Sequence, residues 1–182
     1  MKIHSIDNLF DFKNKVILIS GTSGLLGASL AKLFLDIGSI VIGFDLKKQK
    51  IFHKNFYHAT IDITDEKKIK KNLDKKNKKF KQIDVIINNA GVSIFTKFEK
   101  RKKKELIKTF QVNIVGTINI CKNYFLLHKK MKLKKCKIIN IGSIYGNISP
   151  DFRIYGKNDN FNSEIYGATK AGVIQLTKYL SV

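Results

Sequence analysis

Short apolar runs recur along the chain, and each is followed by a segment with apolar residues at helical intervals. The first run, residues 16–19, has the length and continuity of a strand that is buried on both faces of a sheet. Residues 28–35 then place apolar side chains three and four positions apart, which predicts a helix. Similar runs predict further strands at residues 40–44, 56–61, 83–87 and 137–141. This alternation predicts an α/β fold with a doubly wound parallel sheet of five strands.

Helical segments are predicted between the later strands. Thr64 has the side chain of an N-cap and predicts a helix from there to about residue 79, with Ile69, Leu73 and Phe80 as its sparse apolar stripe. A longer helical region follows the fourth strand. Because ligands gather at the carboxyl ends of parallel strands, the polar residues just after the strands are candidates for a binding site.

A glycine-rich loop joins the first strand to the first helix and contains Gly21, Gly24 and Gly27. Glycine lets such a loop turn tightly, brings backbone N–H groups close to a pyrophosphate, and allows the helix to pack near the strand. The loop therefore predicts a dinucleotide site. The candidate binding residues here are Gly21, Ser23, Gly24, Leu25, Leu26 and Gly27.

The second strand ends in Asp45, close to where a dinucleotide fold places its ribose-binding acid. A carboxylate there accepts hydrogen bonds from a ribose 2′-hydroxyl and repels a 2′-phosphate, which favours NAD over NADP as the cofactor. Two alternatives stay open. Lys47 and Lys48 could attract a phosphate, or Asp45 is an ordinary strand-end residue.

Tyr166 and Lys170 lie four residues apart in a helix-compatible run, so both side chains would share one helix face. A phenol is a poor acid or base at neutral pH, but an adjacent ammonium favours the phenolate form. The pair is therefore a candidate for proton transfer. The alternative is a surface Tyr-x-x-x-Lys pair without a function.

Several motifs follow one another in a defined order along the chain. They are Gly21, Gly24 and Gly27, then Asp62, Asn88-Asn89-Ala90-Gly91, Asn113, Ser143 and Tyr166-x-x-x-Lys170. In this order they resemble the short-chain dehydrogenase/reductase family, and the match spans nearly the whole chain. The resemblance implies a Rossmann-type fold and NAD(P)-dependent hydride transfer.

The resemblance also implies a catalytic role for four residues. Tyr166 would act as general acid and base, while Lys170 would assist it and hold the nicotinamide ribose. Ser143 would orient the substrate oxygen, and Asn113 would anchor a water that relays protons to Lys170. Taken alone, Asn113 also fits a helix-kink partner and Ser143 a turn residue at a strand end.

Further cofactor contacts are implied by the same resemblance. Asp62, with Ile63 beside it, resembles the acid that contacts adenine. Asn89, Ala90 and Gly91 resemble the segment that lines the cofactor. Tyr166 and Lys170 would complete the cofactor site at the nicotinamide end.

Two features bear on the substrate class, and the first of them gives mixed signals. The G-x-x-G-x-x-G spacing resembles extended family members that act on sugar nucleotides, whereas Asn-Asn-Ala-Gly resembles the shorter dehydrogenases. A long insert separates Ser143 from Tyr166, and its Ser-Ile-Tyr-Gly segment resembles members found in bacterial surface-sugar pathways, such as flagellar or capsular sugars. Within it, Arg153 is the candidate to bind a substrate carboxylate or phosphate. The other candidate substrate-binding residues, Ser143 and Tyr166, flank the insert. An exposed loop arginine is the alternative.

Only residues 171–182 follow Lys170, whereas the resemblance implies further strands and a substrate lid. We therefore expect residues 1–182 to form a single NAD(P)-binding Rossmann domain that lacks its C-terminal strands and leaves the fifth strand at an edge. The predicted function is NAD-dependent hydride transfer to or from a secondary alcohol or ketone of a sugar or sugar-nucleotide-like substrate. The alternatives are a non-catalytic dinucleotide-binding remnant and an epimerase or dehydratase of the extended type. A complete form is expected to be a homo-oligomer.

Composition and charge change this picture little. With 182 residues and 43% hydrophobic content, the chain suits one domain with its own core. The formal charge of +21 suggests a nucleic-acid or anionic-membrane partner. However, only Arg101 and Arg153 among the 35 basic residues are arginines, and aromatic residues are not interleaved with the lysine runs. We therefore expect solvated helix faces and no specific nucleic-acid binding.

The sequence also lacks the signals of membrane, export and metal binding. No apolar run approaches the ~18 residues of a membrane span, and residues 1–7 lack the plan of a signal peptide. These observations predict a cytoplasmic protein without a membrane partner. Cys121 and Cys136 belong to no C-x-x-C motif or Cys/His cluster, so we expect reduced structural thiols and no metal site.

Overall fold

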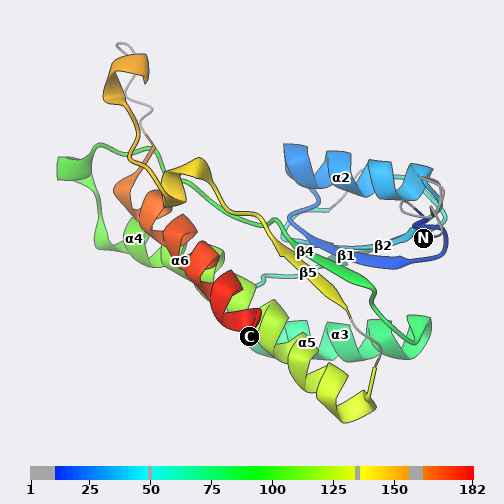
Figure 1. Cartoon of the computed structure of the whole chain (residues 1–182). Helices are drawn as coiled ribbons and strands as arrows, with labels where there is room; N and C mark the ends of the chain where they lie inside the picture. The colour runs from blue at the N-terminus through cyan, green and yellow to red at the C-terminus, as the bar shows by residue number, and fades with distance from the viewer. Residues whose placement is uncertain (1–10, 49–50, 134–135, 156–161) are drawn as a thin grey trace, which may run out of the picture.

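A five-stranded parallel β-sheet forms the centre of the computed structural model (Figure 1). The structure describes residues 11–48, 51–133, 136–155 and 162–182, so the leading residues 1–7 and part of the insert between Ser143 and Tyr166 lie outside the described residues. The strands lie in the order β3-β2-β1-β4-β5 and pair in parallel, which confirms the predicted fold class. They are β1 (Val16–Ser20), β2 (Ile40–Asp45), β3 (Phe56–Thr60), β4 (Val85–Asn88) and β5 (Lys137–Asn140).

The strand order reverses beside β1, which makes the β1–β4 boundary the switch point of the sheet. The chain adds β2 and β3 on one side of β1 and then β4 and β5 on the other side. The β1–β4 register runs from Ile17 opposite Val85 to Ile19 opposite Ile87. The loops that follow these two strands therefore leave the sheet side by side. Ligands of doubly wound sheets bind at such a point, outside the carboxyl ends of the strands.

Helices lie against both faces of the sheet (Figure 1). α2 (Leu25–Asp36) packs on one face, and α3 (Glu66–Phe80) and α5 (Thr117–Met131) pack on the other. α4 (Lys103–Phe110) and α6 (Glu164–Leu180) contact each other beside this second layer. Among the described residues, no helix has the length and apolar character needed to cross a membrane.

Alternate residues of β1 contribute to two hydrophobic cores. Ile17 and Ile19 are fully buried and share a core with Ala31 and Leu35 of α2. Leu18 is also fully buried, but it belongs to the core formed with α3 and α5. Since a strand covered on both faces must be apolar at every position, β1 appears in the sequence as a continuous apolar run.

The cap of α3 differs from the prediction. Asp65 is the N-cap residue, and its side chain accepts a hydrogen bond from the Lys68 N–H at 3.0 Å. The predicted cap, Thr64, instead donates its N–H and hydroxyl to the Asp62 carboxylate. Asp and Thr are both good N-cap residues, so local sequence does not decide between two neighbours of these types.

β5 lies at the edge of the described sheet, as predicted. Its first three residues are exposed, and the exposed fractions of Ile138 and Ile139 are 37% and 46%. β1, which pairs with β4 on its other side, is buried at every position. β5 therefore has an incomplete cover, although its sequence is apolar.

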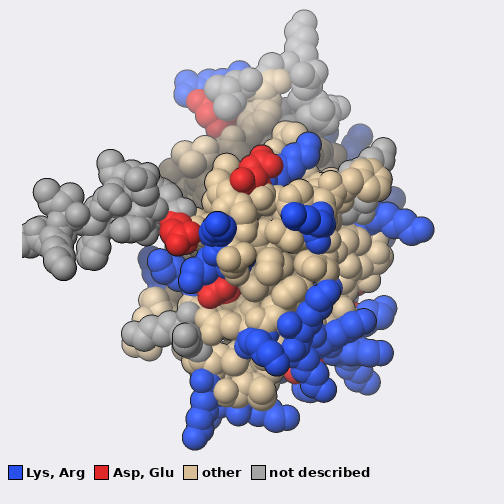
Figure 2. Space-filling model, turned by 90° about the vertical axis from the view of Figure 1, so that its right-hand side faces the viewer, with Lys and Arg blue, Asp and Glu red and all other residues tan. Residues whose placement is uncertain are grey.

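Basic side chains outnumber acidic ones on the face shown in Figure 2. The lysines of α3 are mostly exposed, while its buried residues are Ile69, Leu73 and Asn77. Cys121 and Cys136 are free thiols, and burial raises the pKa of each to about 11. Both thiols are therefore protonated at neutral pH.

Candidate active site

The glycine loop leaves β1 in a backbone conformation that favours glycine. Gly21 has a φ of +77°, and a β-carbon there would lie 2.8 Å from the Cα atom of Ala90. A β-carbon at Gly27, near the start of α2, would overlap the carbonyl oxygen of Gly21. These two glycines therefore allow close approach between the loop, α2 and the segment after β4.

Ser20 and Asn89 hold the two loops together at the switch point. The Ser20 Oγ atom accepts hydrogen bonds from the N–H groups of Asn89 and Ala90, each at 3.1 Å. Asn89 Nδ2 donates to the carbonyl oxygens of Ser20 at 3.0 Å and of Gly21 at 3.2 Å. Asn89 was predicted only to line the cofactor, and Ser20 was not predicted at all. Their mutual bonds join residues 69 apart in the chain, which leaves no local pattern in the sequence.

A cleft of about 520 Å³ lies over the glycine loop. Because α2 begins without a side-chain cap, the N–H groups of its first turn are available to a bound anion. Lys47, Lys108 and Val112 also line the cleft. The predicted cofactor residues that line it are Gly21, Ser23, Gly24, Leu25, Leu26, Gly27, Asp45, Asp62, Ile63, Asn89, Ala90 and Gly91.

Both predicted carboxylates of the cleft are oriented by neighbouring donors. Asp45 Oδ2 accepts from the Ser23 N–H at 2.8 Å, and its Oδ1 accepts from the Lys47 N–H at 2.9 Å. Asp62 Oδ1 accepts from the N–H and the hydroxyl of Thr64, at 2.8 and 2.7 Å. A carboxylate offers about four acceptor positions, so each group retains capacity for a ligand donor.

A second cavity, of about 480 Å³, adjoins the cleft. Leu26, Asn89, Gly91 and Val92 line both spaces. The second cavity is also lined by the predicted catalytic residues Ser143, Tyr166 and Lys170. Residues from the segment after β5 and from α6 thus meet next to the cleft that holds the glycine loop.

The first turns of α6 position the predicted proton-transfer pair, Tyr166 and Lys170. Ser163 caps the helix by accepting a hydrogen bond from the Tyr166 N–H at 3.2 Å. Lys170 Nζ lies 5.7 Å from the centre of the Tyr166 ring, so the two groups share one side of the helix. Lys170 is only 6% exposed and donates to the Ile141 carbonyl oxygen at 2.6 Å. Burial lowers the pKa of its ammonium group.

Asn113 lies in a π-helix, Gln111–Gly116, that interrupts the long helical region between α4 and α5. Its Oδ1 accepts from the Val92 N–H at 2.8 Å, while its Nδ2 donates to the Val92 carbonyl and to Thr169 Oγ1, both at 3.0 Å. π-helical turns are frequent at functional sites. The Asn113 side chain is not among the described residues that line either cavity. Asn113 therefore connects the segment after β4 to α6 without lining either cavity.

Arg153 lies outside this arrangement. Its guanidinium binds the carboxylate of Asp151 in its own loop, with Nη2 at 2.8 Å from Oδ2, and its side chain is 91% exposed. It is not among the described residues that line the second cavity. The predicted anion-binding arginine thus lies in the setting of the alternative, an exposed loop arginine.

Polar residues that were not predicted complete the wall of the second cavity. The Ser93 hydroxyl donates to Asn162 Oδ1 at 3.1 Å. The hydroxyl oxygens of Tyr145 and Tyr155 lie 2.8 Å apart. All four residues line the cavity. Three of them belong to or follow the Ser-Ile-Tyr-Gly segment, which was the available signal in the sequence.

Comparison with known proteins is consistent with this geometry. The profile of the short chain dehydrogenase family matches residues 15–182. The 3-oxoacyl-acyl-carrier-protein reductase FabG of Thermotoga maritima is 28% identical over 175 residues, which cover 91% of this chain and 66% of that protein. The chain spans between 61% and 69% of the length of the curated relatives it matches.

Two solved structures show the same arrangement of the chain. A short chain dehydrogenase from Leptospira borgpetersenii with bound NAD+ is 36% identical with a TM-score of 0.88, and the match covers 99% of this chain and 68% of that one. The aldohexose dehydrogenase of Thermoplasma acidophilum is 27% identical with a TM-score of 0.79, and the match covers 93% of this chain and 61% of that one. With its glycine loop, Tyr-x-x-x-Lys pair and parallel sheet in the places described above, the chain belongs to the short chain dehydrogenase family.

Proposed function

We propose that the protein is an NAD-dependent oxidoreductase that interconverts a secondary alcohol and a ketone. The observation that carries this proposal is the adjacency of the two spaces, because the glycine-loop cleft and the cavity with Ser143, Tyr166 and Lys170 share a wall. A ligand that spans them would have its pyrophosphate at the glycine loop and its reactive ring beside Tyr166. When bound, NAD supplies or accepts the hydride.

The residues of the cleft fit this cofactor. Gly21 and Gly27 leave room where side chains would fill the loop, and Asp45 supplies a carboxylate at the end of β2. That carboxylate would accept hydrogen bonds from the ribose hydroxyls of NAD and would repel the 2′-phosphate of NADP. The solved Leptospira relative, which contains NAD+, supports the same choice. Lys47 also lines the cleft and is the feature that would favour NADP instead.

Proton transfer is assigned to residues of the second cavity. Tyr166 would give its hydroxyl proton to the carbonyl oxygen during reduction and take a proton from the alcohol during oxidation. The Lys170 ammonium would stabilise the phenolate that remains after donation. Ser143 would donate a hydrogen bond to the same substrate oxygen. Asn113 would keep Val92 and Thr169 in place around this group through the bonds described above.

We further propose a sugar-like, polyhydroxylated substrate. The second cavity presents hydroxyl and amide groups from Ser93, Tyr145, Tyr155 and Asn162, which can exchange hydrogen bonds with several substrate hydroxyls. Relatives named as an NAD-dependent glycerol dehydrogenase and an aldohexose dehydrogenase act on substrates of this kind. The acyl-carrier-protein reductases among the relatives mark the competing substrate class.

Cofactor titration and turnover test the proposal together. Fluorescence titration with NADH and NADPH should give tighter binding of NADH. Turnover should then be measured by NADH absorbance with glycerol, aldohexoses and a 3-oxoacyl thioester, each in the appropriate direction. Activity with polyols or sugars is expected to exceed activity with the thioester. Tighter NADPH binding would refute the cofactor assignment, and a preference for the thioester would refute the substrate class.

A second candidate function is dinucleotide binding without turnover. The exposure of Ile138 and Ile139 on β5 favours it, because a parallel strand next to an active site is normally covered on both faces. In this case NADH would bind in the cleft while every carbonyl and alcohol tested would remain unchanged. The same titration and turnover assays therefore separate the two functions.

A further inference from the structure

Arg101 is buried in a chain that otherwise carries its positive charge on exposed lysines. Its side chain is 4% exposed, although the residue lies in the lysine-rich segment between the 3-10 helix Phe98–Lys100 and α4. A buried guanidinium is unfavourable unless its N–H groups are paired. The partners of this side chain therefore show why arginine stands at this position.

The Arg101 guanidinium joins two segments that form the second cavity. Its Nη1 donates to the carbonyl oxygen of Ile94 at 2.6 Å, and its Nη2 donates to that of Thr96. Its Nε and Nη2 donate to the two carboxylate oxygens of Glu164, at 3.1 and 3.3 Å. The two carbonyls flank Phe95 of the cavity wall, and Glu164 is the first residue of α6.

The start of α6 carries Tyr166, the proton donor of the proposed reaction. Glu164 precedes Tyr166 by two residues, in the turn that Ser163 caps. Residues 94–96, which Arg101 binds on the other side, follow Val92 and Ser93 of the same cavity. Arg101 therefore ties the start of the Tyr166 helix to residues 94–96, which include Phe95 of the cavity wall, without lining this cavity itself.

We propose that Arg101 is a positioning residue for the reaction, and that it acts by clamping residues 94–96 to the first turn of α6. The inference rests on the proposed function, because the position of Tyr166 matters only if Tyr166 transfers a proton. Lysine cannot replace arginine here, since its three N–H donors lie on one nitrogen and cannot reach two carbonyls and both oxygens of a carboxylate together.

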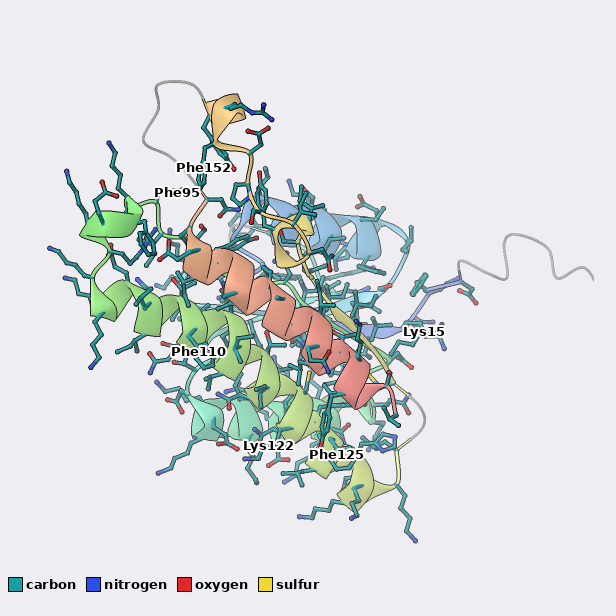
Figure 3. All side chains as sticks on the ribbon, turned by 60° about the vertical axis from the view of Figure 1, so that its left-hand side comes forward. Lys15, Phe95, Phe110, Lys122, Phe125 and Phe152 are labelled. Carbon is teal, nitrogen blue, oxygen red and sulfur yellow. The ribbon has the colours of Figure 1, made fainter. Side chains whose placement is uncertain are left out.

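The chain offers a matched control for this clamp. Glu66 is the first residue of α3 and pairs with Lys122 of α5 at 2.9 Å, just as Glu164 begins α6 and pairs with Arg101. Figure 3 shows Lys122 on α5, away from Phe95 and Phe152. The control pair is half exposed, with side-chain exposures of 55% and 47%, and is not among the described residues lining the two cavities. Loss of this pair removes a helix-start ion pair without touching the site.

The first test compares Arg101→Lys and Glu164→Gln with Lys122→Met and Glu66→Gln in the whole chain. Arg101→Lys should lower kcat at least tenfold and Glu164→Gln severalfold, because small displacements of a reacting group reduce rates strongly. The Kd for NADH should stay within about twofold, since the clamp does not reach the glycine loop. The control variants should leave both quantities unchanged. An unchanged kcat in Arg101→Lys would overturn the positioning role. So would a fall in kcat that is accompanied by weaker NADH binding and a lower thermal stability.

Chemical rescue provides a readout that a purely structural residue would not give. Arg101 also lines a cavity of about 580 Å³ together with Phe98 and Phe152, so a small cation can reach its position. Millimolar guanidinium should restore part of kcat to Arg101→Ala, whereas methylammonium at the same concentration should not. Absence of rescue, in a variant that is folded and binds NADH, would count against the clamp.

Hydrogen exchange separates failure of the clamp from failure of the proposed function. If the wild-type chain binds NADH but turns over none of the alcohols or carbonyls, the proposed function fails. The clamp still predicts faster amide exchange at residues 94–97 and 164–168 in Arg101→Lys, and unchanged exchange there in Lys122→Met. Equal exchange in the two variants would refute the clamp whatever the activity.

Discussion

Gly21 and Gly38 form a natural pair for testing how tightly the glycine loop is packed. Both have positive φ, at 77° and 85°, so alanine strains the backbone at either position. A β-carbon at Gly38 would meet Lys13 Cγ at 3.5 Å, an ordinary contact. A β-carbon at Gly21 would lie 2.8 Å from Ala90 Cα and 2.9 Å from Asn89 Nδ2. Gly38→Ala therefore measures the loss of stability caused by the left-handed backbone conformation alone. Gly21→Ala adds a clash with the segment after β4.

The expected magnitudes follow from these distances. A left-handed backbone conformation costs alanine about 1–2 kcal/mol, which is the folded-state cost expected for Gly38→Ala. Overpacking against a rigid neighbour typically adds about 1–3 kcal/mol, so Gly21→Ala should lose about 2–5 kcal/mol in total. The smaller unfolded-state entropy of alanine applies to both variants and cancels in their difference.

Urea denaturation of the two variants measures the difference directly. NADH should stabilise wild type and Gly38→Ala by about 2.7 kcal/mol at one hundred times Kd, because the cofactor binds only the folded chain. Gly21→Ala should lose most of this stabilisation, since the added methyl group pushes apart the two loops that line the cleft. Equal losses of stability in the two variants, or full NADH stabilisation of Gly21→Ala, would refute the close packing inferred for the loop.

Three further predictions concern the charged and proton-transfer groups. Tyr166→Phe should reduce turnover on the order of a hundredfold while leaving NADH affinity nearly unchanged, and retention of a tenth of the turnover would contradict its role. Asp45→Asn should narrow the preference for NADH over NADPH in a fluorescence titration, whereas an unchanged ratio would assign selectivity to Lys47. Burial lowers the pKa of Lys170, so the unfolded chain binds more protons between that lowered pKa and about 10.4. Wild type should therefore gain stability relative to Lys170→Met as the pH rises through this window, and parallel stability curves for the two proteins would show that the ammonium is not desolvated.

The residues around the glycine-loop cleft could be placed together from the sequence because they follow strands that the apolar runs reveal. Gly21, Asp45 and Asn89 come directly after β1, at the end of β2 and after β4, and a parallel sheet brings such positions to one edge. The fold needed little more than the continuous apolar runs. Only the element ends moved, by up to three residues at the start of α2 and by two at the start of α3, where neighbouring Thr and Asp compete for the cap.

The supporting contacts were not predictable in the same way. Ser20 binds the segment after β4, and Arg101 binds the start of α6, through bonds between residues more than 60 apart in the chain. Arg101 and Arg153 are chemically identical in the sequence, and only burial tells them apart. The exposed Arg153 was chosen from its place in the insert, whereas the buried Arg101 was hidden in a lysine-rich run.

The two halves of the site differ in how they are held, and this difference bears on function. The glycine loop is fixed by the sheet itself, since β1 and β4 pair directly and Ser20 and Asn89 bind across them. α6, by contrast, lies beside β5, whose Ile138 and Ile139 are partly exposed, and side chains hold its first turns in place. Changes at the sheet should therefore affect cofactor affinity first. Changes at the side-chain contacts of α6 should affect the rate of proton transfer while the cofactor stays bound.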